Sequence, residues 1–115
     1  MADVFDKDAA LERVDNDVDL LKELVDICST EYASKIKDLR IAMQSGDSKT
    51  VSEIAHSLKS AFGNVGAMVG HNTAFDLELA GKKGSSSDLT TLVSSFERAV
   101  GEFFLTFNEE KDKLK

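Results

Sequence analysis

The sequence predicts an all-α fold, an antiparallel up-down four-helix bundle with a short N-terminal capping helix. Three observations support this prediction. The 115 residues contain no proline, and long segments repeat apolar side chains at intervals of three and four residues. Most of the seven glycines lie between these segments, where short loops would join antiparallel neighbours. Residues 1–115 are therefore expected to form a single domain with one core.

Five helices are expected, and most of them have a residue suited to begin or end them. Asp6 and the pair Asn16-Asp17 are N-cap candidates, because short polar side chains can accept from the first backbone N–H groups. Gly46 and Gly84 suit the left-handed backbone that ends many helices. The glycines and asparagine of residues 63–66 should interrupt the backbone between the third and fourth helices. The expected helices cover residues 7–14, 17 or 18 to 44, 48–62, 67–82 and 88–113, with a loop at residues 85–87.

The apolar stripes of these helices indicate a packed core. Cys28 is the only cysteine, which excludes an internal disulfide and fits a reducing compartment. It lies on the apolar stripe of the second helix and is expected to be a small buried hydrophobe. The last helix has a stripe typical of a bundle helix rather than of a binding site, formed by Leu89, Leu92, Val93, Phe96, Val100, Phe103, Phe104 and Phe107.

Charge and hydropathy exclude several classes of partner. Fourteen Lys and Arg against 21 Asp and Glu give a net charge of −7, so nucleic acids and anionic membrane surfaces would repel the chain. The basic pair Lys82-Lys83 is too small to reverse this. No apolar stretch approaches the ~20 residues that span a bilayer, and the start of the chain lacks the pattern of a signal peptide. We therefore expect no membrane insertion, a cytoplasmic location, and a monomer whose bundle closes without a partner.

His56 lies on the third helix, on the side turned away from that helix's own apolar stripe. At about 100° of rotation per residue, its ring projects roughly 150° from the centre of the stripe. Its neighbours on the helix are Ser52, Lys59, Ser60 and Gly63, which are three small residues and one cation. The imidazole is therefore expected to be accessible, and another protein could approach it closely.

Three interpretations of His56 compete at this point, the first being a surface histidine without function. The second is metal binding, because Glu53 and His56 have the Glu-x-x-His spacing of bundles that bind two metal ions. Such sites need the motif twice with inward-facing ligands, whereas here it occurs once and His56 faces outward. No metal and no other cofactor is therefore expected. The other histidine, His71, has no lysine three residues later and is expected to be structural.

The third interpretation is phosphoryl transfer. An imidazole with a pKa near ~6.5 is largely neutral at cytoplasmic pH, so one ring nitrogen has a free lone pair. This nitrogen can attack phosphorus and form a phosphoramidate that is labile enough to pass its phosphoryl group to an aspartate. Lys59, one turn along the helix, would favour the neutral imidazole beforehand and offset the phosphoryl charge afterwards.

The residues around His56 resemble the motif of histidine-containing phosphotransfer (HPt) domains. That motif is roughly His-x-Leu-Lys-Gly-Ser/Ala, followed by Gly-Asn-Leu/Ile-Gly-Ala. The resemblance extends over nearly the whole chain, including Leu77-Glu78 and Gly84 downstream. The matching segments are His56-Ser57-Leu58-Lys59-Ser60-Ala61 and Gly63-Asn64-Val65-Gly66-Ala67.

The resemblance implies a four-helix bundle that relays phosphoryl groups in two-component signalling. His56 would be the phosphoacceptor, Lys59 would stabilise the phosphoryl group, and Ser52, Ser60 and Gly63 would form the surface that a partner approaches. The partners would be a response-regulator receiver domain, a hybrid sensor histidine kinase, or both. The chain would be a carrier rather than an enzyme, and would depend on its partner's catalytic site and Mg²⁺.

One departure and one alternative accompany this resemblance. The family commonly has glycine after the lysine, where this chain has Ser60, which narrows the approach to the ring. The alternative function is a helical adaptor that binds signalling partners without phosphotransfer. The presence of both His56 and Lys59 argues against an adaptor, because it has no chemical need for either. An enzyme is not favoured, since neither a nucleotide-binding glycine loop nor a convergent set of carboxylates is found.

Overall fold

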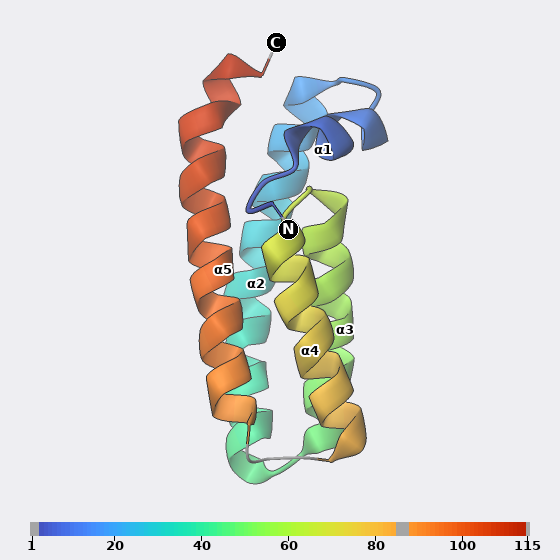
Figure 1. Ribbon diagram of the computed structural model, residues 1–115, viewed down its shortest axis with the longest axis vertical. Helices are drawn as coiled ribbons and strands as arrows, with labels where there is room; N and C mark the ends of the chain where they lie inside the picture. The colour runs from blue at the N-terminus through green and yellow to red at the C-terminus, as the bar shows by residue number, and fades with distance from the viewer. Residues whose placement is uncertain (1–2, 85–87, 115) are drawn as a thin grey trace.

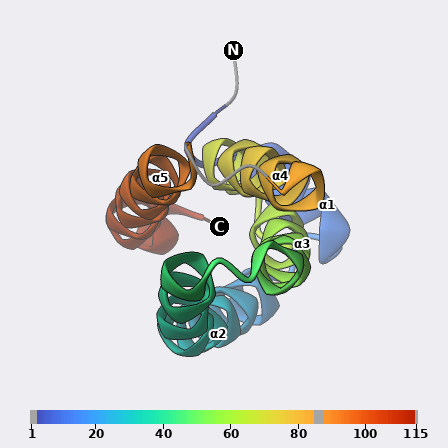
Figure 2. The same cartoon turned by 90° about the horizontal axis from the view of Figure 1, so that it is seen from below.

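The computed structural model describes residues 3–84 and 88–114, and its four long helices form an antiparallel bundle (Figure 1). Seen along its axis, α2, α3, α4 and α5 follow one another around the bundle in chain order (Figure 2). The fold class predicted from the sequence is confirmed. The loop expected at residues 85–87 lies outside the described residues. The elements are α1 (Lys7–Arg13), α2 (Val18–Ser45), α3 (Ser48–Asn64), α4 (Met68–Lys83), α5 (Leu89–Glu110) and a 3-10 turn, η1 (Lys111–Lys113).

The predicted caps define four of the helix ends. The carboxylates of Asp6 and Asp17 accept from the backbone N–H groups of Ala9 and Leu20, each at 3.1 Å, and so begin α1 and α2. Gly46 and Gly84 end α2 and α4 in the left-handed conformation, with φ of 75° and 70°. These four predictions agree with the structure because each depends only on local backbone chemistry.

Two predicted boundaries differ from the structure by two residues or more, and the others agree to within one residue. The third helix continues two residues beyond its expected end, through Gly63 to Asn64, and the backbone turns only at Gly66, where φ is 76°. A Cβ at Gly66 would lie 2.5 Å from the carbonyl oxygen of Asp6, so this turn needs a glycine for close approach as well as for its dihedral angle. The last α-helix ends at Glu110, and its expected final residues form η1 instead.

An aromatic cluster fills the centre of the bundle. Phe62 of α3 packs edge-to-face against Phe96 and Phe103 of α5, with ring centroids 5.7 and 6.2 Å apart. Phe5, in the segment before α1, contacts Phe103 in the same way at 5.7 Å. The segment before α1 is also tied to the α3–α4 turn, because the Asp6 N–H donates to the Gly66 carbonyl at 2.7 Å. The stripe predicted on the last helix is therefore mostly core, and α1 covers one end of the bundle (Figure 1).

Cys28 is buried in this core, as predicted. Its side chain lies on α2 with only 3% of the residue exposed. Burial, with a smaller contribution from the nearby charge of Glu31, raises the pKa of the thiol to about 12.

Two glycines, one on each helix, permit close contact between α3 and α4. A Cβ at Gly81 of α4 would lie 2.9 Å from the Ser48 carbonyl oxygen and 2.8 Å from the Ser52 nitrogen, both on the α3 backbone. A Cβ at Gly63 of α3 would lie 2.8 Å from the imidazole Nδ1 of His71 on α4. We call the stretch of α3–α4 contact that runs from Gly81 to Gly63 the α3–α4 seam. His56 lies on α3 within this seam.

Candidate functional site

The imidazole of His56 is exposed at the seam, as its position on the helix predicts. Its side chain is 62% exposed, while its Nδ1 atom lies 3.0 Å from the carboxylate Oε2 of Glu78 on α4. An ionised carboxylate can only accept a hydrogen bond, so Nδ1 carries the ring proton. The lone pair of the neutral ring is therefore on Nε2, the nitrogen on the far side of the ring from Glu78.

Glu78 is the centre of the site. Only 6% of its side chain is exposed, and three side chains converge on its carboxylate. Its Oε1 lies 2.8 Å from Nζ of Lys59, and its Oε2 lies 3.3 Å from Nζ of Lys82 and contacts His56. The hydrogen bond from Lys59, followed by those from Lys82 and His56, outweighs the effect of burial and lowers the Glu78 pKa to about 2. Glu78 is therefore a carboxylate throughout the physiological range.

The side chain of Lys59 is more buried than that of Lys82, the lysine of α4 that also contacts Glu78. Its side chain is only 20% exposed, and its ammonium group lies 5.1 Å from the centre of the Phe75 ring as well as beside Glu78. Lys82, by contrast, is 63% exposed and is joined to Glu78 along one turn of α4. The two lysines flank the same carboxylate with very different freedom to move.

The three residues expected to form the docking surface have different positions. Ser60 is exposed, and its hydroxyl is 3.3 Å from the His56 carbonyl, to which it donates. Ser52 is buried, so the expectation that it faces a partner is wrong: its backbone and Cβ pack against Gly81. Gly63 is half-buried, and the space left by its missing side chain is occupied by the His71 ring rather than left open above His56.

His71 has a structural environment. Its Nδ1 lies 2.9 Å from the backbone carbonyl oxygen of Lys59, which can only accept, so this nitrogen also carries a proton. The half-buried ring fills the position beside Gly63 and joins α4 to α3. The carbonyl of Lys59 belongs to the turn of α3 that also holds the Lys59 side chain against Glu78.

Sequence reasoning missed Glu78 and Lys82 as members of this site. From the sequence alone, Glu78 stands out only within the family resemblance and Lys82 only as part of a basic pair. One available indication was the position of Glu78 on the stripe of Ala74, Leu77 and Gly81, which are all buried. A carboxylate on such a stripe needs partners, and Lys82 follows it at the i+4 position.

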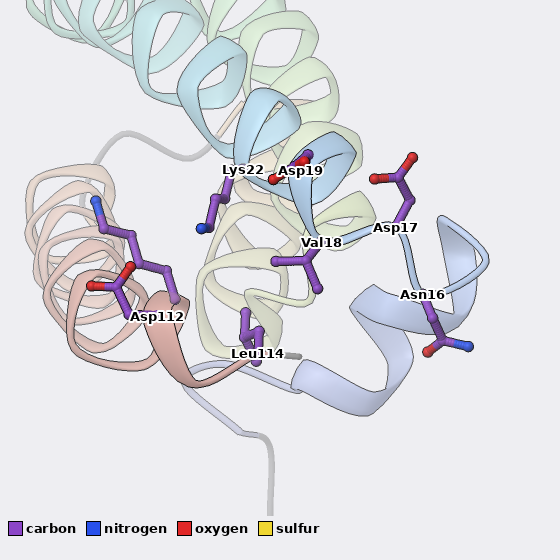
Figure 3. A pocket seen from close by; sticks show the side chains of 8 residues that line it. Asn16, Asp17, Val18, Asp19, Lys22, Asp112 and Leu114 are labelled. Carbon is purple, nitrogen blue, oxygen red and sulfur yellow. The ribbon is translucent and has the colours of Figure 1, made fainter.

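Other features of the described residues add no ligand site. Within residues 3–84 and 88–114, no cluster of three or more His, Cys, Asp or Glu side chains is arranged to bind a metal ion. In the same part of the chain, no helix combines the length and apolar character needed to cross a membrane. A hollow at one end of the bundle is lined by residues around the start of α2 and by residues of η1 and Leu114, rather than by residues of α3 or α4 (Figure 3). Asp17 caps α2 there and Leu114 is buried, so both have structural roles.

Comparison with known proteins supports the same interpretation of the fold. The family model described as "Hpt domain" matches residues 23–103, which is more than half of the chain. The chain belongs to the Hpt domain family. Its role is therefore histidine phosphotransfer in a phosphorelay, as a phosphoryl carrier rather than a catalyst, with kinase or receiver partners of two-component systems.

A solved structure shows the same fold. The crystal structure of histidine-containing phosphotransfer protein B (HptB) from Pseudomonas aeruginosa PAO1 is similar, with a TM-score of 0.87 and 22% sequence identity. The match covers 98% of each chain. A search of curated proteins finds no match to this sequence. The Hpt assignment thus depends on the family model, while the structural match extends the shared architecture over nearly the full length.

Proposed function

We propose that Nε2 of His56 is the phosphoacceptor of this Hpt domain. One observation carries the proposal: the exposed ring has its Nδ1 proton bonded to the Glu78 carboxylate, so the nucleophilic lone pair is on the nitrogen facing away from it. His71 offers no comparable arrangement, because its Nδ1 bonds a neutral carbonyl and its ring is packed beside Gly63.

The transfer step needs no proton removal from His56. The Nε2 lone pair attacks the phosphorus of an aspartyl phosphate on a receiver domain, and a P–N bond forms as the P–O bond to aspartate breaks. The electrons of that bond return to the aspartate, which leaves as a carboxylate. The ring keeps its Nδ1 proton and becomes positively charged, and Glu78 stabilises this charge as it develops. Reversal of the same step passes the phosphoryl group to a receiver aspartate.

Lys59 contributes positive charge beside the reacting ring. Its ammonium group contacts Glu78, whose other oxygen accepts from His56, and its carbonyl holds His71. We propose that Lys59 stabilises the phosphoryl group mainly through its charge, since its nearest partner is the carboxylate. The Mg²⁺ and the catalytic groups for transfer would come with the receiver or hybrid kinase partner.

The partner surface should surround the exposed ring, with Ser60 at its edge. We propose a monomeric, cytoplasmic carrier, in line with a bundle that buries its aromatic core within one chain and with a reduced, buried Cys28. Each partner would have to place the aspartate that gives or receives the phosphoryl group directly over Nε2. Ser60, which is small and exposed one turn from His56, leaves room for such an approach.

The test is labelling by a phosphorylated receiver, or by a hybrid kinase with ATP. We expect an acid-labile, base-stable phosphoryl group on the wild-type protein. His56→Gln should abolish it, whereas His71→Gln should retain it once circular dichroism shows a folded bundle. Labelling that persists in His56→Gln would overturn the assignment. An unlabelled wild-type protein that still binds receivers would indicate the adaptor alternative.

A further inference from the structure

We infer that Lys82 is the mobile cation that moves to the phosphoryl group on His56. This inference rests on the proposed function and names a second residue for the same reaction. The relevant observation is that Lys82 and His56 contact the same oxygen of Glu78, Oε2, at 3.3 and 3.0 Å. The Lys82 ammonium group is therefore positioned one hydrogen-bonded step from the imidazole before any phosphoryl group arrives.

Moving Lys59 away from Glu78 would lose more free energy than moving Lys82 away from it. Lys59 is 20% exposed, stands over the Phe75 ring, and provides the largest contribution to the low pKa of Glu78. Removing it would leave a buried carboxylate without its main partner, which is strongly unfavourable. The Lys82 side chain is 63% exposed, so water screens its ammonium group, and its contact with the buried Glu78 along one helical turn is worth less than that of Lys59. Lys82 can leave Glu78 while Lys59 remains.

The charge balance of the phosphorylated site requires a second cation. A phosphoryl group adds a charge of about −1.5 to −2 at neutral pH, and Glu78 is already ionised. The phosphorylated ring and Lys59 each supply one positive charge, and both contact Glu78. Lys82 brings the sum close to neutrality, and its flexible stem lets the ammonium group reach the outward-facing side of the ring.

This arrangement predicts separate roles for the three groups. Glu78 orients the ring, Lys59 keeps Glu78 ionised, and Lys82 exchanges the shared oxygen of Glu78 for a phosphoryl oxygen. Since Lys82 is exposed, water and salt weaken its effect, and we expect about a two- to fivefold change in the transfer equilibrium. The effect should therefore decrease as the salt concentration rises.

The experiment measures the equilibrium of phosphoryl transfer between the full chain and a phosphorylated receiver domain. Lys82→Gln should shift it about two- to fivefold away from the phosphohistidine, and Lys82→Arg should restore most of the loss. Lys83→Gln is the matched control, because Lys83 is an exposed lysine in the same last turn of α4 but about 100° around the helix. It removes the same charge from the chain and should leave the equilibrium unchanged.

A second readout separates stabilisation of the phosphoryl group from positioning of the ring. Nitrogen-15 spectra of Lys82→Gln should show His56 still protonated on Nδ1, because Glu78 remains in place. An altered tautomer would overturn the inference, since Lys82 would then act through the ring. Equal equilibria for Lys82→Gln and Lys83→Gln, with His56 still labelled, would also overturn it and leave the proposed function intact. Absence of label in the wild-type protein would instead contradict the proposed function.

Discussion

The two ends of the α3–α4 seam each hold a histidine by its Nδ1 proton, but they present it differently. At the Gly63 end, His71 donates to the neutral carbonyl of Lys59, and its half-buried ring fills the gap beside the glycine. At the Gly81 end, His56 donates to the ionised Glu78, and its ring is 62% exposed. The Nδ1 hydrogen bond thus supports packing at His71, and in the proposed function it supports nucleophilic attack by Nε2 of His56.

The two histidines differ in the group that accepts the hydrogen bond from Nδ1 and in the access that a partner has to Nε2. A carboxylate can stabilise a positive charge on the ring, whereas a neutral carbonyl stabilises it far less. The exposed ring of His56 leaves Nε2 open to a partner, while the ring of His71 is covered in part by α3. A histidine in a bundle is therefore best assessed by the group that bonds its Nδ1 and by what surrounds its other nitrogen.

The largest expected effect is on the free energy of unfolding, and it comes from a substitution at a glycine of the α3–α4 seam. Gly81→Ala would force a Cβ against the backbone of α3, which cannot rotate away, and we expect a loss of about 2–3 kcal/mol in the free energy of unfolding. The displaced α4 would also carry Glu78 away from His56 and slow phosphotransfer. Chemical denaturation and receiver-dependent labelling measure the two effects.

Two other glycines serve as controls for this prediction. In Gly63→Ala the atoms nearest the new methyl group belong to the His71 ring, a side chain that can shift, and the gain in helix propensity offsets the disturbed contact, so the change should stay below about 1 kcal/mol. Gly101→Ala on α5 adds a methyl group to open space and should stabilise the protein by up to about 1 kcal/mol. Similar losses at positions 81 and 63 would show that the two ends of the seam pack alike, contrary to this comparison.

The next largest effect is expected on the rate of phosphotransfer when the carboxylate of Glu78 is replaced. Glu78→Gln should slow phosphotransfer about tenfold, because a neutral amide gives up most of the stabilisation of a charged ring. It should also change the pH dependence of stability. The Glu78 pKa lies below its ordinary value, so its stabilising effect is present above about pH 4.5 and is lost as the pH falls towards 2.

Acid unfolding of Glu78→Gln tests the predicted change in the pH dependence of stability. Glu78→Gln should remove the part of the stability loss that occurs between about pH 4.5 and 2, relative to the wild-type protein. Glu53→Gln is a suitable control, because Glu53 is an exposed carboxylate on the same helix as His56. Identical acid profiles for the wild-type protein and Glu78→Gln would show that Glu78 is not held ionised by its neighbours.

The smallest effect is expected at Ser60, on the exposed side of His56. Its hydroxyl turns back to the His56 carbonyl, so Ser60→Gly removes little from the reacting face and widens the approach. Transfer rates should stay within about twofold of the wild type or rise, while the helix loses about 0.5 kcal/mol. A large fall in the rate of a folded Ser60→Gly variant would give Ser60 a direct part in transfer.

The sequence predicts those features that depend on one helix at a time. Asp6, Asp17, Gly46 and Gly84 identify helix ends through local backbone chemistry, and a single helical projection places His56 outward. The continuation of α3 through Gly63 was not predicted, because its propensity cost is offset by packing against His71.

Features that depend on the distance between helices were less accessible from the sequence. Ser52 is small and near His56 along α3, which suggested an open surface, yet the close approach of Gly81 buries it. Glu78 reaches His56 only because α4 packs in that register, and no projection of α3 alone can reveal it. The proposed phosphoacceptor could thus be identified from the sequence, whereas the carboxylate that positions its ring could not.

The position of Cys28 has a practical consequence for studying this relay. A thiol whose pKa is raised to about 12 is almost wholly protonated near pH 7, and thiolates rather than thiols react with maleimides and peroxide. A cysteine introduced on the outer surface could therefore carry a fluorophore while the native one stays unmodified. Association with a receiver could then be followed by fluorescence, without first removing a side chain from the interior.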